Sequence, residues 1–329
     1  MGIGNCIKRP FLALMLLLMA LAGCAQHHRP SFAAAHPLML DAWTFDGKGG
    51  YRIHSPHYLI YTTIDDKELM GGVAEMMEGA LLEYRKLTPG VPLSDEPMDC
   101  YFFAQRPQWA TFTRKNTGPD AAIYLQIVRG GYTLHDVFVA YFIGDYGTFS
   151  VAAHEGWHQY VARHFKGRLP PFLEEGIACM FENVTLRDGV PVWNWAVNPS
   201  RSDALRRAVE HHRTWPLEQL VTMHAGEVVD QAGDRIEAFY AQDWAFARFL
   251  WEAEGGRYRP ALQKLLADTA AGTVHDPTRS HQRHDGPWDP AGVQPILEYY
   301  LNMPMDQIAA AYWRYVREAL RNEPDAAAS

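Results

Sequence analysis

The chain has 329 residues, of which 48% are hydrophobic, and a formal net charge of −8 at pH 7. This length allows one large core or two lobes. The acidic balance, without a run of basic residues to meet phosphates, disfavours nucleic acid as the partner. The composition is therefore typical of a globular protein and leaves enzymes and binding modules as function classes.

The first 23 residues are typical of a signal peptide. A positive pair, Lys8 and Arg9, precedes an apolar stretch over residues 11–21. Because this stretch is too short to span a bilayer as a lasting anchor, we expect it to be removed from the mature protein.

A cysteine follows the apolar stretch directly. The segment Leu21-Ala-Gly-Cys24 resembles the small-residue box of bacterial lipoproteins. The resemblance implies that Cys24 is lipidated and that this lipid anchors the protein to a membrane. Because Ala25 rather than an aspartate follows, the resemblance implies the outer membrane, facing the periplasm. A leader with an incidental cysteine is the alternative.

Hydrophobic periodicity predicts the elements of the next hundred residues. Alternating apolar positions indicate a strand over 51–63 and a second strand over 98–103, with a helix over 65–87 between them. Two further strands, over 123–128 and 132–143, form a predicted hairpin that leads into the next helix. We expect the strand before that helix to be the edge along which a peptide could pair.

The most informative motif is His154-Glu-Gly-Trp-His158, the pattern His-Glu-x-x-His. Thr148 and Ser150 are candidate N-caps, and helical apolar spacing continues to a stop at Gly167. On a helix, two histidines four residues apart lie about 40° apart around the axis, so both can bind one metal ion. The pattern is typical of zinc hydrolases, in which Glu155 would take a proton from a water molecule.

A catalytic zinc site needs a third protein ligand. His164 stands six residues after His158, but Val161 replaces the glycine that would break the helix between them. Without that break His164 lies about 120° around the helix and faces away from the metal. The other candidates lie on the next predicted helix, which opens at Pro170-Pro171.

That next helix carries a family resemblance. Glu175-Gly176-Ile-Ala178 is similar to the stretch that supplies the third ligand in gluzincin metallopeptidases. The resemblance implies a ligand set of His154, His158 and Glu175 around one Zn²⁺, with small residues that let the two helices approach closely. With the lipoprotein leader, the chain also resembles uncharacterised bacterial lipoproteins considered zinc peptidases. We expect the two histidine nitrogens and one Glu175 oxygen to converge within about 2.0–2.2 Å of one point.

Two positions beside these ligands stay open. Glu174 would exchange roles with Glu175 if the register shifted by one residue, because only one of the two can face the metal. Cys179 stands where thermolysin-like members have an aspartate that orients a histidine. The group that orients the histidine must therefore differ, with Glu182 or a backbone carbonyl as candidates.

A tyrosine that stabilises the oxyanion is also implied by the family. The segment 237–250 resembles the corresponding helix of aminopeptidase-like gluzincins, and Tyr240 is our choice for that role. The alternative is a core tyrosine with its hydroxyl at the surface. Gln242 and Asp243 would lie nearby, on the helix surface.

Two cysteines remain after the leader. An oxidising compartment permits a disulfide between Cys100 and Cys179, although two cysteines do not make a framework. For Cys179, buried packing is the alternative.

The remaining segments predict a helical C-terminal part. After a small hairpin over 184–193, helices are expected at 200–213, 233–254, 257–270 and 304–321, with a polar loop at 272–292. The expected fold class is α+β, with a gluzincin-like zincin architecture and the site between two lobes. The expected organisation is a signal peptide (1–23), a tether (24–48), a β-containing N-terminal lobe (49–147), a zinc-binding helical region (148–270), a surface loop (271–292) and C-terminal helices with a tail (293–329).

Two functions follow from these patterns. The first is a zinc metallopeptidase of the cell envelope that hydrolyses peptide bonds, with a peptide or protein as substrate. The second is a catalytically silent lipoprotein that binds or assembles with other proteins and retains a zincin fold. Turnover of a peptide would distinguish them.

Overall fold

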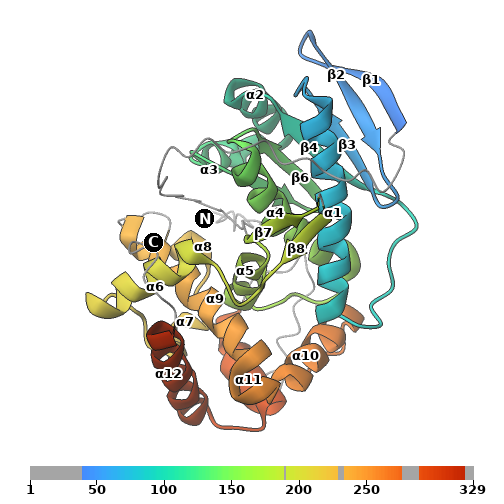
Figure 1. Cartoon of the computed structure of the whole chain (residues 1–329). Helices are drawn as coiled ribbons and strands as arrows, with labels where there is room; N and C mark the ends of the chain where they lie inside the picture. The colour runs from blue at the N-terminus through green and yellow to red at the C-terminus, as the bar shows by residue number, and fades with distance from the viewer. Residues whose placement is uncertain (1–38, 189, 229–232, 276–288, 323–329) are drawn as a thin grey trace, which may run out of the picture.

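A mixed sheet and its covering helices form one part of the molecule, and the rest of the described chain is helical apart from a two-stranded hairpin (Figure 1). The computed structural model describes residues 39–188, 190–228, 233–275 and 289–322. The structure combines helices with a mixed sheet, which is compatible with the α+β class predicted from the sequence.

The sheet has six strands in the order β1-β2-β3-β4-β6-β5. Strands β3, β4 and β6 run parallel to one another, whereas β5 is antiparallel to β6. The strands are β1 (Met39–Phe45), β2 (Lys48–His54), β3 (Tyr58–Thr62), β4 (Met98–Phe103), β5 (Gly131–Leu134) and β6 (Val137–Tyr141). The edges of this sheet are therefore β1 and β5.

The helices and the small hairpin complete the described fold. The α-helices are α1 (Lys67–Leu87), α2 (Arg106–Asn116), α3 (Ala121–Tyr124), α4 (Asp145–His164), α5 (Pro171–Met180), α6 (Pro199–Glu210), α7 (Leu217–Leu220), α8 (Ala225–Val228), α9 (Gly233–Gly256), α10 (Arg259–Ala271), α11 (Val293–Leu301) and α12 (Met305–Asn322). Short 3-10 helices cover Gly118–Asp120 and Pro290–Gly292, and the hairpin pairs β7 (Val184–Arg187) with β8 (Val190–Trp193).

Helices cover both faces of the sheet, and the strand alternation explains how. On β4, Cys100 and Phe102 belong to the large core that includes α1 and α4. Phe103 belongs to a second hydrophobic cluster, which contains Trp109 of α2, and the partly buried Tyr101 packs against that cluster. Successive strand residues point to opposite faces, so one strand serves two cores.

Helix α4 begins three residues before the predicted N-cap. Its N-cap is Gly144, whose φ of 93° suits glycine, and Asp145 starts the helix. Thr148 is buried inside the helix, where its hydroxyl accepts a hydrogen bond from the backbone of Ile143. The prediction of Thr148 or Ser150 as the cap was therefore wrong.

Three other predicted boundaries were wrong. Met39–Phe45, expected to belong to a tether over 24–48, pairs with β2 as an edge strand. The single strand expected over 51–63 is two strands of a hairpin. The strand expected over 123–128 is the end of α3 and a turn, and the stretch 132–143 contains both strands of the hairpin, β5 and β6. The edge strand is therefore β5, and the strand directly before α4 is internal.

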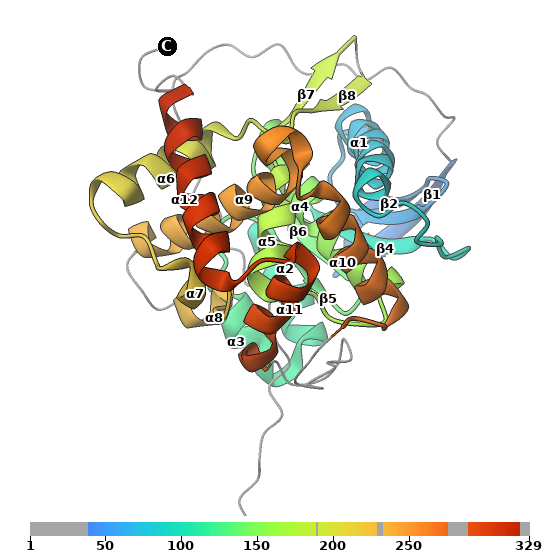
Figure 2. The same ribbon diagram turned by 90° about the horizontal axis from the view of Figure 1, so that it is seen from below.

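Helices α4 and α5 lie at the centre of the molecule, between the sheet and the C-terminal helices (Figure 1, Figure 2). A Cβ atom on Gly176 of α5 would lie 2.2 Å from the backbone oxygen of Asp243 on α9. Glycine at this position therefore permits the close approach of α5 to α9. The approach expected from the sequence was instead that of the two predicted metal helices, α4 and α5.

The C-terminal part follows the predicted helices closely, with α6, α9, α10 and α12 at the expected places and α7, α8 and α11 in addition. Among the described residues, the helices are too short or too polar to cross a bilayer. The predicted signal peptide, Cys24 and most of the polar loop lie outside the described residues.

Candidate metal centre

The structure brings His154, His158 and Glu175 together in the interior. The two Nε2 atoms lie 3.2 Å apart, and one oxygen of Glu175, Oε2, lies 3.3 Å from Nε2 of His154 and 3.5 Å from Nε2 of His158. All three side chains are buried, and together they form a group that could hold a metal ion. The histidines come from α4 and the glutamate from α5.

The size of this triangle fits a tetrahedral ion. Zinc bonds of about 2.0–2.1 Å at tetrahedral angles place neighbouring ligand atoms about 3.3–3.4 Å apart. The three observed separations, 3.2, 3.3 and 3.5 Å, are centred on that spacing. Two imidazoles and one carboxylate leave a fourth position free, which is the ligand count of catalytic zinc sites.

A second buried carboxylate orients His154. Oε1 of Glu182 lies 3.0 Å from Nδ1 of His154, on the far side of the ring from the triangle. Arg201 donates to both Glu182 oxygens, at 2.9 and 2.6 Å. Asn198 donates to Glu182 at 2.7 Å, while its side-chain oxygen caps α6. Glu182 was one of the two predicted candidates for this orienting role.

The neighbouring carboxylate, Glu174, orients the other histidine. Its Oε1 lies 2.9 Å from Nδ1 of His158, so Glu174 and Glu175 contact opposite nitrogens of one ring. The register is thus the one in which Glu175 faces the metal group and Glu174 lies outside it. Histidine ligands commonly donate their second ring N–H to a carboxylate in this way, which fixes the tautomer.

The electrostatics of the cluster follow from burial and from these carboxylates. Burial by itself would lower the pKa of His158, but Glu175 and Glu174 outweigh it and hold that pKa well above its ordinary value. Burial by itself would raise the pKa of Glu175, but His158 and His154 lower it to about 2. In the metal-free protein the cluster therefore holds protons on imidazole that a metal ion would displace.

Glu155 lies beside the cluster, on the same helix as the histidines. It is fully buried, and burial raises its pKa, while His158 and His154 oppose that shift. The hydroxyl of Thr133 lies 3.1 Å from Oε2 of Glu155, whereas Oε1 has no hydrogen-bond partner among the described residues. One carboxylate oxygen is thus held, and the other remains for a small ligand such as water.

Tyr240 lies close enough to the cluster for the charge of Glu175 to raise its pKa. It is buried on α9. Burial raises its pKa well above its ordinary value, and the charge of Glu175 raises it further. The guanidinium of Arg201 lies 5.2 Å from the centre of its ring. The hydroxyl of Tyr240 thus stays neutral.

The surface positions predicted for Gln242 and Asp243 were wrong, since both are fully buried. The side chain of Gln242 bonds the backbone of Trp215 at both ends, at 2.8 and 3.0 Å. Both oxygens of Asp243 lack a hydrogen-bond partner among the described residues, and burial raises the pKa of this carboxyl well above its ordinary value.

The remaining candidates lie outside the triangle. His164 bonds the backbone of Ser94 and of Tyr160 and belongs to no metal-ligating group of the described residues. Cys100 and Cys179 are both buried and free, so the permitted disulfide is not formed. Cys179 does lie with His154 and Glu182 in a second group of ligand type, but both Glu182 oxygens are bound by Arg201.

Three supporting residues were not found from the sequence. Arg201 and Asn198 reach Glu182 from a helix more than fifteen residues downstream, and Thr133 reaches Glu155 from the edge strand. The only local signal was Asn198-Pro199, which is typical of a helix start and gives no indication of a contact with Glu182.

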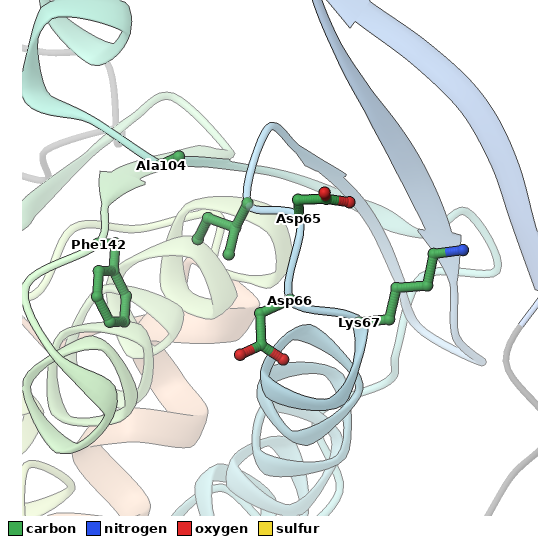
Figure 3. A pocket seen from close by; sticks show the side chains of 6 residues that line it. Asp65, Asp66, Lys67, Ala104 and Phe142 are labelled. Carbon is green, nitrogen blue, oxygen red and sulfur yellow. The ribbon is translucent and has the colours of Figure 1, made fainter.

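A hollow of about 530 Å³ lies elsewhere, where β3, β4 and β6 end (Figure 3). Its lining is Ile64, Asp65, Asp66, Lys67, Ala104 and Phe142, and Asp66 already caps α1 through Leu69. None of these residues belongs to the metal cluster. The chemistry of the donors, rather than the size of a hollow, therefore identifies the candidate site.

No protein-family model, curated protein or solved structure matches the chain. The assignment of the site depends on its residues and their geometry.

Proposed function

We propose that the protein is a zinc-dependent metallopeptidase of the gluzincin type, which hydrolyses peptide bonds with Glu155 as general base. The observation that carries the proposal is the buried triangle of two imidazole nitrogens and one carboxylate oxygen. Beside it lies the Glu155 carboxylate, one oxygen of which has no hydrogen-bond partner among the described residues. A structural zinc site would need neither the open fourth position nor a base.

In this proposal His154, His158 and Glu175 hold one zinc ion. Zinc bound there would act as a Lewis acid, lowering the pKa of water and polarising the substrate carbonyl. Glu174 and Glu182 fix the ring planes of the two histidines by accepting their Nδ1 protons. Arg201 in turn holds Glu182 in place.

Glu155 moves the protons of the reaction. Its carboxylate takes a proton from water as the water oxygen attacks the carbonyl carbon, and later gives that proton to the leaving nitrogen. Tyr240 is proposed to donate a hydrogen bond to the carbonyl oxygen as negative charge develops on it. Its neutral hydroxyl and its place beside the cluster support that role.

The substrate is proposed to be a peptide or protein that pairs with β5. That strand is a sheet edge among the described strands, and its Thr133 contacts Glu155. An extended peptide can add to a free strand edge through backbone hydrogen bonds. The proposed location is the bacterial envelope, with a lipid on Cys24 as the membrane anchor.

A peptide-library digest tests the proposal. Zinc-loaded wild-type protein should cleave members of the library, and Glu155→Gln should bind one equivalent of zinc yet cleave at least about a hundredfold more slowly. A fully active Glu155→Gln variant would contradict the assignment. Zinc binding by a wild-type protein that cleaves nothing would instead support the catalytically silent binding module.

A further inference from the structure

The hydroxyl of Thr133 contacts Glu155 at two points. Its Oγ1 lies 3.0 Å from the backbone oxygen of Glu155 and 3.1 Å from the side-chain atom Oε2. Thr133 belongs to β5, whereas Glu155 is in the middle of α4. The contact therefore joins the edge strand of the sheet to the residue that carries the proposed proton transfer.

The position of Thr133 is fixed by the helix it contacts. Gln159 donates to the backbone oxygen of Asp136, in the turn between β5 and β6, at 2.8 Å. Arg163 forms an ion pair with the Asp136 carboxylate. Glu155, Gln159 and Arg163 follow one another at intervals of four residues, so one face of α4 contacts both β5 and the turn that follows it.

The two carboxylate oxygens of Glu155 have different surroundings as a result. Oε2 lies within hydrogen-bond distance of the Thr133 hydroxyl, while Oε1 is buried without a partner among the described residues. A hydroxyl has one proton to donate. When it donates to Oε2, that oxygen is less available to take a proton, and Oε1 is left to do so.

We propose that Thr133 is a positioning residue that binds Oε2 of Glu155 and thereby presents Oε1 to the attacking water. This inference rests on the proposed function. One O–H bond of water breaks, its proton goes to Oε1, and its electron pair stays on the water oxygen, which bonds the carbonyl carbon. When the carbonyl re-forms and the C–N bond breaks, the proton moves from Oε1 to the leaving nitrogen.

Three variants test the role by kinetics. Thr133→Val keeps the shape of the side chain but removes the hydroxyl, and should lower kcat about tenfold with KM within about twofold. Thr133→Ser restores the hydroxyl and should stay within about twofold of wild type in kcat. Thr185→Val removes a hydroxyl on β7 that bonds the backbone of Val192, and serves as the control.

A double variant separates positioning from a general loss of structure. In the Glu155→Gln background, Thr133→Val should cause no further loss of the residual rate, because the side chain that Thr133 positions can no longer take the proton. A tenfold loss in that background as well would overturn the proposal. So would an unchanged kcat in Thr133→Val alone.

A crystal structure of zinc-loaded Thr133→Val gives a readout independent of activity. The Glu155 carboxylate should leave its wild-type orientation or occupy two, while zinc and its three ligands keep their places. An unchanged Glu155 orientation would overturn the proposal. If wild-type protein cleaves no peptide, the proposed function fails, but this comparison of structures still decides whether Thr133 positions Glu155.

Discussion

Glu174 and His158 form a partly buried hydrogen bond of 2.9 Å, on the side of the imidazole opposite to Glu175. Two consecutive glutamates of α5 thus contact the two nitrogens of one ring. Glu175 is the proposed ligand, and Glu174 fixes the direction in which the proposed ligand nitrogen of His158 points.

Removing this carboxylate should weaken metal binding. We expect Glu174→Ala to lower zinc affinity about 10- to 100-fold, because His158 loses the acceptor that sets its orientation and tautomer. Competition with a chromophoric chelator measures the affinity. Glu83→Ala, which removes an exposed pair with Lys86 on α1, is the control. Equal affinities of Glu174→Ala and wild type would show that this hydrogen bond has no role in binding.

The stabilisation that zinc provides should increase with pH. In the metal-free protein the lowered pKa of Glu175, about 2 against an ordinary 4.5, contributes stability above about pH 4.5 that is lost as the pH falls toward 2. The raised pKa of His158 contributes stability below about pH 6.5, which is lost as the pH rises through the folded value. Zinc requires neutral imidazole, so it replaces this lost contribution at high pH.

Thermal unfolding with and without zinc measures this dependence. The rise in Tm on adding zinc should be larger at pH 8 than at pH 5.5, and metal-free protein should be most stable between about pH 4.5 and 6.5. A zinc-induced shift of equal size at both values would contradict the cluster electrostatics.

The buried pair of Arg201 and Glu182 should be sensitive to loss of one partner. Arg201→Leu leaves Glu182 as a buried carboxylate without its main counter-charge, and we expect unfolding free energy to fall by about 3–5 kcal/mol. Arg207→Leu, on the same helix but in an exposed pair with Glu237, should cost less than about 1 kcal/mol. Urea unfolding of both variants makes the comparison, and equal losses would mean that burial of the pair is not what matters.

Close packing of α5 on α9 should tolerate no side chain at Gly176. The Cβ atom of Gly176→Ala would overlap the backbone of Asp243, so we expect a loss of about 1–3 kcal/mol in unfolding free energy. Gly156→Ala approaches only the hydroxyl end of Tyr84, at 2.7 Å, and should cost less. A larger loss for Gly156→Ala would contradict this packing.

The sequence predicts most of this candidate site because the proposed ligands lie on two consecutive helices with strong periodicity. A motif of spacing four brings His154 and His158 onto one helix face, and Glu175 follows after a short connection. The hairpin is less accessible from the sequence, since the pattern predicts its turn between the strands 123–128 and 132–143, whereas the actual turn lies at His135-Asp136. Contacts between distant segments, such as Thr133 with Glu155, depend on tertiary packing and leave no local pattern.

The most direct test of the central claim is diffraction from zinc-soaked crystals at the zinc absorption edge. The account predicts one strong anomalous peak about 2.0–2.2 Å from Nε2 of His154, Nε2 of His158 and a carboxylate oxygen of Glu175. A peak at His164, or none within reach of these three residues, would contradict it.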